Sequence, residues 1–312
     1  MPLTDEGLET LELLFLNTIH DITLKYLQEI LERFYLRIKL YSFWKKQFTS
    51  SEEIKRLSDL GVGAERVFHT IFAKSTNWSP SSIPVGSNLF YESDKAFVNV
   101  DIKSIYVENS WDYLGVSEVG ERQTSYPMQN TWGAKEKFMP QLPVYYEIND
   151  KQKPCLTYII QIIHVDIDRI LEKKYDPNAI AFILLAVPNG LLYEKYGEKI
   201  IEEPKSYHQK EGRRYRPANF RYAYYSYPWF AELKTKGIEQ YRVRVAFNGN
   251  YLGKRFATKY KFNEELIVEM LPEKVTKMPY DIAKKTTTIF RKTDDKTILT
   301  NYEFKGTTSI LS

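Results

Sequence analysis

The chain has 312 residues, a formal net charge of +4 and 27% charged residues, the composition of an ordinary globular protein with a substantial core. It contains one cysteine, Cys155, and four histidines, which excludes an internal disulfide and argues against a zinc site of Cys/His type. No apolar run is long enough to span a bilayer, and no basic start precedes an apolar segment at the N-terminus, so we expect no membrane contact. The lone cysteine suits a reducing cytoplasm, where we expect the protein to be.

The N-terminal part of the chain has the periodicity of a helix. Between residues 4 and 49, apolar residues such as Leu8, Leu11 and Phe15 recur at steps of three and four, and Thr4 is a suitable N-terminal cap. The apolar stripe fits packing on a core as well as contact with a second subunit, because either use buries one face of the helix. The pattern alone does not separate the two.

Two further helices are expected before the first strand. One begins near residue 50 and pauses at 61–63, and another covers about 64–74 with Glu65 in its first turn. The helix dipole alone explains an acid at that position, because it favours negative charge near a helix N-terminus. A polar loop follows at 77–82, where turn-forming residues cluster.

The clearest strand signal lies in the segment 83–104. A turn at 93–95 separates two extended halves, and the second half, 96–104, is rich in β-forming residues. Because side chains alternate across a strand, one face of this half is apolar and the other is polar. The apolar face consists of Val98, Val100 and Ile102, and the polar face consists of Asn99, Asp101 and Lys103.

The pair formed by Asp101 and Lys103 has a chemical use. A carboxylate binds divalent cations such as Mg²⁺, which prefer oxygen ligands, and a neighbouring ammonium can stabilise charge on a phosphate or position an attacking water. These parts suit the metal-assisted hydrolysis of a phosphodiester. The alternative is a salt bridge on an exposed strand face, because isolated Asp-x-Lys tripeptides are common.

Several strands are expected in the second half of the chain. They lie at 142–148, 156–165, 179–188 and 241–248, and the second of them is apolar on both faces, as in a central buried strand. Together with the helices they indicate an α/β protein with helical flanks. The C-terminal end, 295–312, reads as a terminal strand or a loosely held end.

The segment 205–221 is strongly basic and carries interleaved tyrosines. Its basic residues are Lys205, Lys210, Arg213, Arg214, Arg216 and Arg221. Concentrated positive charge suits a DNA backbone, and arginine forks together with Asn219 can address base edges. The alternative is a solvated loop with structural tyrosines.

Three blocks of the sequence resemble one enzyme family. They are residues 100–104 (Val-Asp-Ile-Lys-Ser), 187–191 (Val-Pro-Asn-Gly-Leu) and 242–245 (Arg-Val-Arg-Val). In this order, they resemble type II restriction endonucleases of the PD-(D/E)xK superfamily, in particular its EcoRV/BglI-like branch. The likeness extends over about residues 60–247.

The resemblance implies a fold and an activity. The fold is a mixed central sheet flanked by helices in residues 61–254, between an N-terminal helical region with a dimer contact, 1–60, and a C-terminal extension, 255–312. The activity is Mg²⁺-dependent hydrolysis of double-stranded DNA at a short symmetric site, leaving 5′-phosphates. The enzyme would be a homodimer, because two-fold symmetry places one active site on each strand.

The resemblance also implies a catalytic site. Asp101 and Lys103 match the family's motif, and Asn88 stands where the family has its first acid, so Glu65 and Glu92 become candidates for further metal ligands, with Asp94 as another source of the acid. An amide ligates a metal more weakly than a carboxylate because it carries no charge. Asn88 also fits an ordinary turn residue. A catalytically impaired DNA-binding relative and a structure-specific repair or recombination nuclease therefore remain alternatives.

Further residues are implied to contact DNA. The Gln-Thr-Ser run at 123–125 resembles a segment that contacts the phosphate backbone beside the cut, and the strand near 242–244 would face the major groove. The full set is Ser104, Gln123, Thr124, Ser125, Asn189, Lys210, Arg213, Arg214, Arg216, Asn219, Arg221, Arg242 and Arg244.

Overall fold

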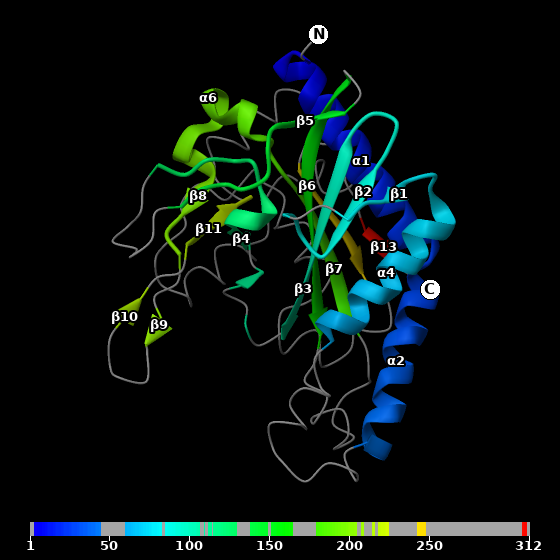
Figure 1. Cartoon of the computed structure of the whole chain (residues 1–312). Helices are drawn as coiled ribbons and strands as arrows, with labels where there is room; N and C mark the ends of the chain where they lie inside the picture. The colour runs from blue at the N-terminus through cyan, green and yellow to red at the C-terminus, as the bar shows by residue number, and fades with distance from the viewer. Residues whose placement is uncertain are drawn as a thin grey trace, which may run out of the picture.

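The protein is built around a mixed β-sheet with helices on one face (Figure 1). The computed structural model describes residues 3–44, 60–82, 85–106, 109, 112–113, 115–129, 138–148, 151–164, 179–204, 207–208, 214–215, 218–224, 242–247 and 308–310. Within these residues, no helix is both long enough and apolar enough to cross a membrane.

Among the described elements, three helices precede the strands, and short helical turns interrupt the strands farther along the chain. The helices are α1 (Asp5–Lys25), α2 (Leu27–Trp44), α4 (Gly61–Ser75) and α6 (Tyr193–Tyr196), with the 3₁₀ turns η2 (Glu121–Gln123), η3 (Gly190–Leu192) and η4 (Gly197–Ile200). The strands are β1 (Ser79–Pro80), β2 (Leu89–Glu92), β3 (Phe97–Tyr106), β4 (Val116–Gly120), β5 (Tyr145–Ile148), β6 (Lys151–His164), β7 (Ala179–Val187), β8 (Ile201–Glu202), β9 (Tyr207–His208), β10 (Arg214–Tyr215), β11 (Asn219–Ala223), β12 (Val243–Phe247) and β13 (Thr308–Ile310).

The main sheet has the strand order β1-β2-β3-β6-β7-β12-β13, with β5 paired to the first residues of β6. The pairs β3–β6 and β12–β13 are parallel, and the other pairs along this path are antiparallel. This arrangement confirms the predicted mixed sheet. The central strand β6 is buried on both faces from Cys155 to His164, as its continuous apolar sequence indicated.

The N-terminal helix differs from the prediction in its continuity. Thr4 caps α1 as expected, since its hydroxyl accepts a hydrogen bond from the Gly7 amide at 3.2 Å. At Tyr26, however, the backbone leaves helical values (φ −110°, ψ 14°), so α1 and α2 are separate helices. The pause predicted at 61–63 is also wrong, because α4 begins at Gly61. The helix predicted from residue 50 lies outside the described residues up to residue 59.

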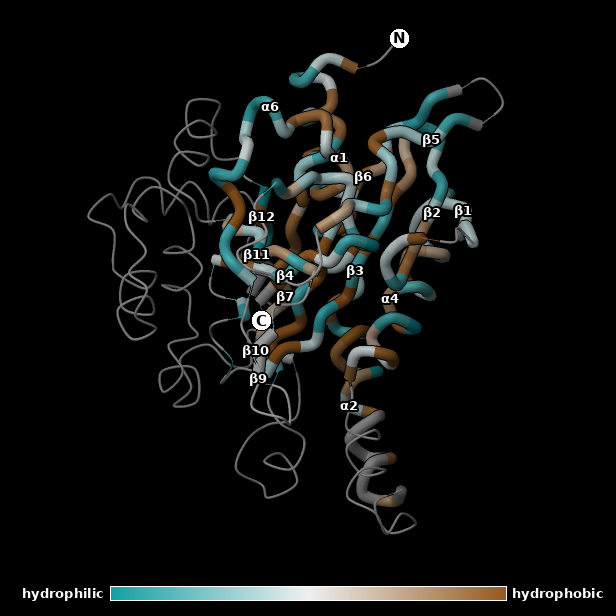
Figure 2. Tube along the Cα trace, turned by 60° about the vertical axis from the view of Figure 1, so that its left-hand side comes forward, coloured by the Kyte–Doolittle hydropathy of each residue, from teal (hydrophilic) through white to brown (hydrophobic). Residues whose placement is uncertain are grey.

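The two faces of the main sheet are covered differently (Figures 1 and 2). Helices cover one face: the Phe68 ring of α4 lies 6.1 Å from the Phe182 ring of β7, and Phe72 packs edge-on against Tyr91 of β2 at 5.9 Å. The opposite face meets a smaller sheet of order β4-β11-β8. The Gln161 side chain of β6 joins the two sheets by donating a hydrogen bond to the Val116 carbonyl of β4 at 3.1 Å.

The smaller sheet was not predicted. Its strands are short: β4 and β8 lie in stretches for which no strand was expected, and β11 begins within the basic segment. Strands of two to five residues bounded by turns give a weak periodic signal. They form because β11 pairs with both neighbours and buries Phe220 and Tyr222 in the core.

A cluster of buried charges ties α1 to the sheet. Glu9 and Glu12 of α1 both accept hydrogen bonds from Arg242, which precedes β12 and has no exposed surface. Glu12 also accepts a hydrogen bond from the Asn189 amide at 2.6 Å. Burial raises the pKa of Glu12, and the Arg242 cation opposes this rise. The apolar stripe of α1 also belongs to the core, since Leu8, Leu16 and other α1 residues join the same hydrophobic cluster as the sheet.

Replacing Arg242 with methionine should destabilise the fold by about 3–5 kcal/mol, because the buried Glu12 carboxylate loses its cation, while Glu9 keeps Lys195. Without the cation, the pKa of Glu12 in the folded state, which burial already raises, rises further above the unfolded value. The folded state then binds more protons than the unfolded state, so the stability of the variant should fall as pH rises and recover in mild acid. Urea unfolding at pH 5 and pH 8 measures both effects.

Lys195→Met serves as the control, because Lys195 reaches the same Glu9 at 3.0 Å from a partly exposed position. Its loss should cost about 1 kcal/mol or less. Equal stability of the Arg242→Met protein and the parent protein would contradict a structural role for the buried cluster.

Candidate functional site

The predicted polar face of β3 is present. Asp101 Oδ2 lies 2.7 Å from Lys103 Nζ, the Asp101 side chain is 4% exposed and the Lys103 side chain is 22% exposed. The contact with Lys103 lacks hydrogen-bond geometry, and Oδ2 is enclosed without a hydrogen-bond partner among the described residues. The carboxylate and ammonium thus stand side by side, as predicted.

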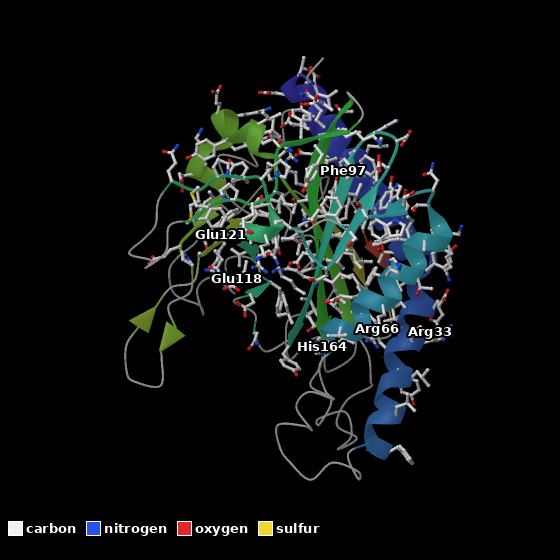
Figure 3. The ribbon with its side chains drawn as sticks, viewed as in Figure 1. Arg33, Arg66, Phe97, Glu118, Glu121 and His164 are labelled. Atoms are coloured by element: carbon white, nitrogen blue, oxygen red, sulfur yellow. The ribbon has the colours of Figure 1, made fainter. Side chains whose placement is uncertain are left out.

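The pair projects from the face of the sheet that the helices leave uncovered. Phe97 begins β3, and His164 of β6 is paired with Tyr106 at the other end of β3, so these two labels mark the ends of the strand pair in Figure 3. In the same view, Glu118 and Glu121 lie on the side of the smaller sheet and Arg66 on the helical side. Asp101 and Lys103 alternate with Val100 and Ile102, which join the helix-covered core.

Asn88 lies beside Asp101. The register of β2 and β3 pairs Leu89 with Val100, so the next position outward sets Asn88 opposite Asp101. The exposed Asn88 side chain donates a hydrogen bond from Nδ2 to the Ile102 carbonyl at 3.3 Å. This bond turns the amide nitrogen towards β3 and leaves the carbonyl oxygen as the group that can bind a ligand.

The other predicted acids are farther from the pair. Glu92 is paired with Phe97, four residues before Asp101 on β3 and therefore about 13 Å along the strand. Its carboxylate forms an ion pair with Lys153 at 2.6 Å. Asp94 lies still farther away, in the turn. Glu65 belongs to α4, which packs on the opposite face of the sheet. The structure therefore does not bring these acids together with Asp101.

The Gln-Thr-Ser run separates into one residue at the site and two in the interior. Gln123 Oε1 accepts hydrogen bonds from Lys103 Nζ at 3.4 Å and from the Gly120 amide at 2.8 Å. Thr124 is fully buried, and its hydroxyl accepts from the Tyr126 amide. Ser125 is also buried and accepts from the Gly190 amide at 3.0 Å. Only Gln123 faces the pair, so Thr124 and Ser125 are withdrawn as DNA contacts.

Asn189 is a buried structural residue. Its amide nitrogen donates hydrogen bonds to the Val144 and Cys155 carbonyls, at 3.0 and 2.9 Å, and its Oδ1 accepts from the Leu191 amide. With 2% exposure and every polar group engaged, Asn189 has nothing left with which to read a base. The expectation that Asn189 contacts DNA is therefore wrong for this structure.

Three of the predicted DNA-binding arginines are also buried. Arg242 is bound to Glu9 and Glu12, Arg244 donates to the Asn17 side chain of α1 at 2.9 Å, and Arg221 forms an ion pair with Glu202 at 3.0 Å. The charge pattern suggested a DNA surface, but the sequence does not reveal that acids pair with Arg221 and Arg242 and that the Asn17 amide binds Arg244.

The structure describes only some of the remaining residues that were predicted to contact DNA. Ser104 is half-buried and, by alternation along β3, points away from Lys103. Asn219 begins β11 and pairs with Gly120, the residue just before η2. Arg214 lies in β10, paired with β9, and its side chain is outside the described part. Lys210, Arg213 and Arg216 lie outside the described residues altogether.

The donor set fits a divalent cation with one charged ligand. Asp101 supplies a carboxylate oxygen without a hydrogen-bond partner in the described structure, and Asn88 supplies a neutral amide oxygen beside it. Mg²⁺ is commonly held by one or two carboxylates and keeps several waters. Among the described residues, no three His, Cys, Asp or Glu side chains gather around one point. The site is therefore suited to weak binding of a hydrated cation.

The architecture is that of restriction endonucleases. The structure is similar to that of the restriction endonuclease BglI bound to its DNA recognition sequence, with a TM-score of 0.55 and 16% sequence identity. The match covers 77% of this chain and 93% of the BglI chain. The tetrameric restriction endonuclease SfiI bound to cognate DNA matches with a TM-score of 0.49 and 13% identity, over 78% of this chain and 86% of that chain. At these identities the first likeness establishes the fold alone.

The sequence establishes the family. Residues 6–169, more than half of the chain, match the family "Type II restriction enzyme MwoI, N-terminal domain". No curated protein matches the chain significantly. The chain belongs to this family of type II restriction enzymes, which confirms the resemblance inferred from the sequence motifs.

Gly190→Ala should disturb the site through Ser125. A Cβ at this position would lie 2.3 Å from the Ser125 carbonyl oxygen, so the backbone must shift rather than a flexible side chain. We expect a loss of about 1–3 kcal/mol of stability, typical of overpacking. Thermal and urea unfolding measure it.

Gly63→Ala is the matched control. A Cβ there meets nothing within 4 Å, and the residue lies in α4. Alanine in place of a helical glycine should stabilise the protein by about 0.5–1 kcal/mol. A Gly190→Ala protein as stable as its parent would argue against the close docking of η3 on Ser125.

Proposed function

We propose that the protein is a type II site-specific deoxyribonuclease that hydrolyses phosphodiesters of double-stranded DNA in the presence of Mg²⁺ and leaves 5′-phosphates. The observation that carries this proposal is the Asp101–Lys103 pair with Asn88 opposite, in a chain of the restriction-enzyme family. A carboxylate and an ammonium on one face of β3, with an oxygen donor opposite them, are the parts that metal-assisted phosphodiester hydrolysis needs.

In this proposal each residue at the site has a separate task. Asp101 and Asn88 hold the divalent cation through oxygen atoms, and Lys103 stabilises the negative charge on the phosphate or positions the attacking water. Gln123 steadies Lys103 through the 3.4 Å hydrogen bond. A bound Mg²⁺ would lower the pKa of its coordinated water and neutralise phosphate charge.

The proposed substrate is duplex DNA. BglI, whose fold is similar to that of this chain, is bound to its DNA recognition sequence, which supports the same partner here. Of the predicted contacts, Gln123, Asn219, Lys210, Arg213, Arg214 and Arg216 stay in the proposal. Contacts to phosphates would set the register of the protein, and contacts to base edges would give the sequence preference.

The proposed assembly is a homodimer acting on a short symmetric site. Two-fold symmetry of the dimer would place one active site at each strand of a palindromic sequence. Because the apolar stripe of α1 packs in the core of its own chain, that stripe is not the surface that would join the two subunits. The N-terminal region keeps its proposed role only through residues of α1 and α2 that do not face this core.

Asn88 gives the second candidate function its support. A neutral amide in place of an acid lowers the negative charge that holds the cation, so a relative that binds DNA and cuts it poorly is the main alternative. A structure-specific repair or recombination nuclease is the third reading. It would cut according to DNA shape and produce random fragments from linear duplex.

The test is cleavage of plasmid DNA with Mg²⁺ or Mn²⁺, followed by sequencing of the ends. We expect discrete fragments with one recurrent end sequence, and no cleavage by Asp101→Asn or Lys103→Ala. Asn88→Asp adds a second carboxylate, so it should raise cleavage at limiting metal by about tenfold, equivalent to roughly 1.4 kcal/mol of metal binding.

One control variant and one binding measurement distinguish the nuclease from the DNA-binding relative. Asp94→Asn changes an exposed acid in the hairpin turn and should leave cleavage unchanged. Sequence-specific binding in a gel-shift assay, combined with no cutting by either the parent or Asn88→Asp in any divalent metal, would replace the nuclease with the DNA-binding relative.

A further inference from the structure

Asn99 is a buried polar residue that joins the two segments flanking the proposed catalytic pair. It lies on β3 two residues before Asp101, on the same face, and has no exposed surface. A buried amide must satisfy its donors and acceptor inside the protein, because an unpaired polar group in the interior is costly. The direction of its hydrogen bonds therefore shows which segments it holds.

One set of these hydrogen bonds holds the loop that carries Asn88. Asn99 Oδ1 accepts from the Ser87 amide at 2.7 Å, and Nδ2 donates to the Ser87 hydroxyl at 2.9 Å. These bonds fix the orientation of the amide, since exchanging its oxygen and nitrogen would set a donor against the Ser87 N–H. The residue held in this way immediately precedes Asn88, the oxygen donor opposite Asp101.

The loop lies close against Asn99. A Cβ on Gly86 would approach Asn99 Oδ1 to 3.3 Å and a ring carbon of Phe90 to 2.9 Å. Glycine leaves the room that a side chain would fill. A side chain at position 86 would therefore crowd Phe90 and Asn99.

Another hydrogen bond holds the segment that carries Gln123. Asn99 Nδ2 donates to the Gln123 carbonyl at 3.1 Å, while the Gln123 side chain accepts from Lys103. Both N–H donors of the Asn99 amide are therefore in use, one towards each segment. One side chain thereby fixes the neighbour of Asn88 and the partner of Lys103.

We propose that Asn99 is the positioning residue of the metal site, which sets Asn88 against Asp101 and Gln123 against Lys103. It does not touch the DNA or the water, because its side chain is enclosed. The inference rests on the proposed nuclease function, since it assigns Asn99 a task in that same site. Residues that orient metal ligands from behind typically change metal affinity or activity by about 10–100-fold when they are removed.

The test is Mn²⁺ binding to the full-length protein, measured by the loss of the free-ion electron paramagnetic resonance signal, beside plasmid cleavage. Asn99→Ala should weaken Mn²⁺ binding by about 10–100-fold in the parent and in the Asn88→Asp background. The Asn88→Asp background keeps a cleavage readout if the parent cuts slowly.

Ser93→Ala is the control for simple loss of stability. The Ser93 hydroxyl is buried at the far end of the same β2–β3 hairpin, where it bonds the Ala96 carbonyl and the amides of Lys95 and Ala96. Both variants should lower the melting temperature, but only Asn99→Ala should weaken Mn²⁺ binding. Circular dichroism confirms that each variant is folded.

A double-mutant cycle with Ser87→Ala tests the route. If Asn99 acts through Ser87, the effects of Asn99→Ala and Ser87→Ala on Mn²⁺ affinity will be less than additive. Mn²⁺ affinity and cleavage of Asn99→Ala equal to the parent, or an equal loss in Ser93→Ala, would overturn the positioning role and leave the nuclease proposal standing. Absence of Mn²⁺ binding and cleavage in both the parent and Asn88→Asp would overturn the nuclease proposal and this inference together.

Discussion

A β-strand sends successive side chains to opposite faces, and β3 uses this alternation to join the core to the site. Val98, Val100 and Ile102 pack under the helices, so Asn99, Asp101 and Lys103 must point to the other side. The parallel pairing with the buried strand β6 holds the register, since a slip by one residue would send the charged side chains into the apolar layer. The catalytic geometry proposed here follows from that register.

Buried charge explains why several arginines serve the fold. Arg242, just before β12, and Arg244, within β12, bind side chains of α1. Their partners Glu9, Glu12 and Asn17 lie more than 200 residues earlier in the sequence. A buried arginine is stable only with a partner, because desolvation of an isolated charge is costly. The same cluster holds the Asn189 amide, and the next residue, Gly190, docks on Ser125 near the site. The N-terminal helix is thereby linked to the segment that carries Gln123.

Family membership describes the fold, whereas the chemistry depends on the few residues of the site. The family and the fold are those of type II restriction enzymes. The chemistry depends on a few oxygen atoms, of which Asn88 contributes a neutral one. A fold can be retained while a site weakens, because core packing in β3 and β6 does not involve the charge at position 88. Metal binding and cleavage must therefore be judged from the site.

The sequence by itself determined the mixed α/β class, the β3 hairpin, the Asp101–Lys103 pair and the family resemblance, because alternation, turn residues and motif order are local properties of the chain. Tertiary structure alone decided that the long helix breaks at Tyr26, that β4, β11 and β8 form a second sheet, and that Glu65 and Glu92 lie away from Asp101. It also decided that Asn189, Arg221, Arg242 and Arg244 are buried. A charge or an amide in a sequence carries no record of its partner, since that partner can lie more than 200 residues away, as Glu12 lies from Arg242.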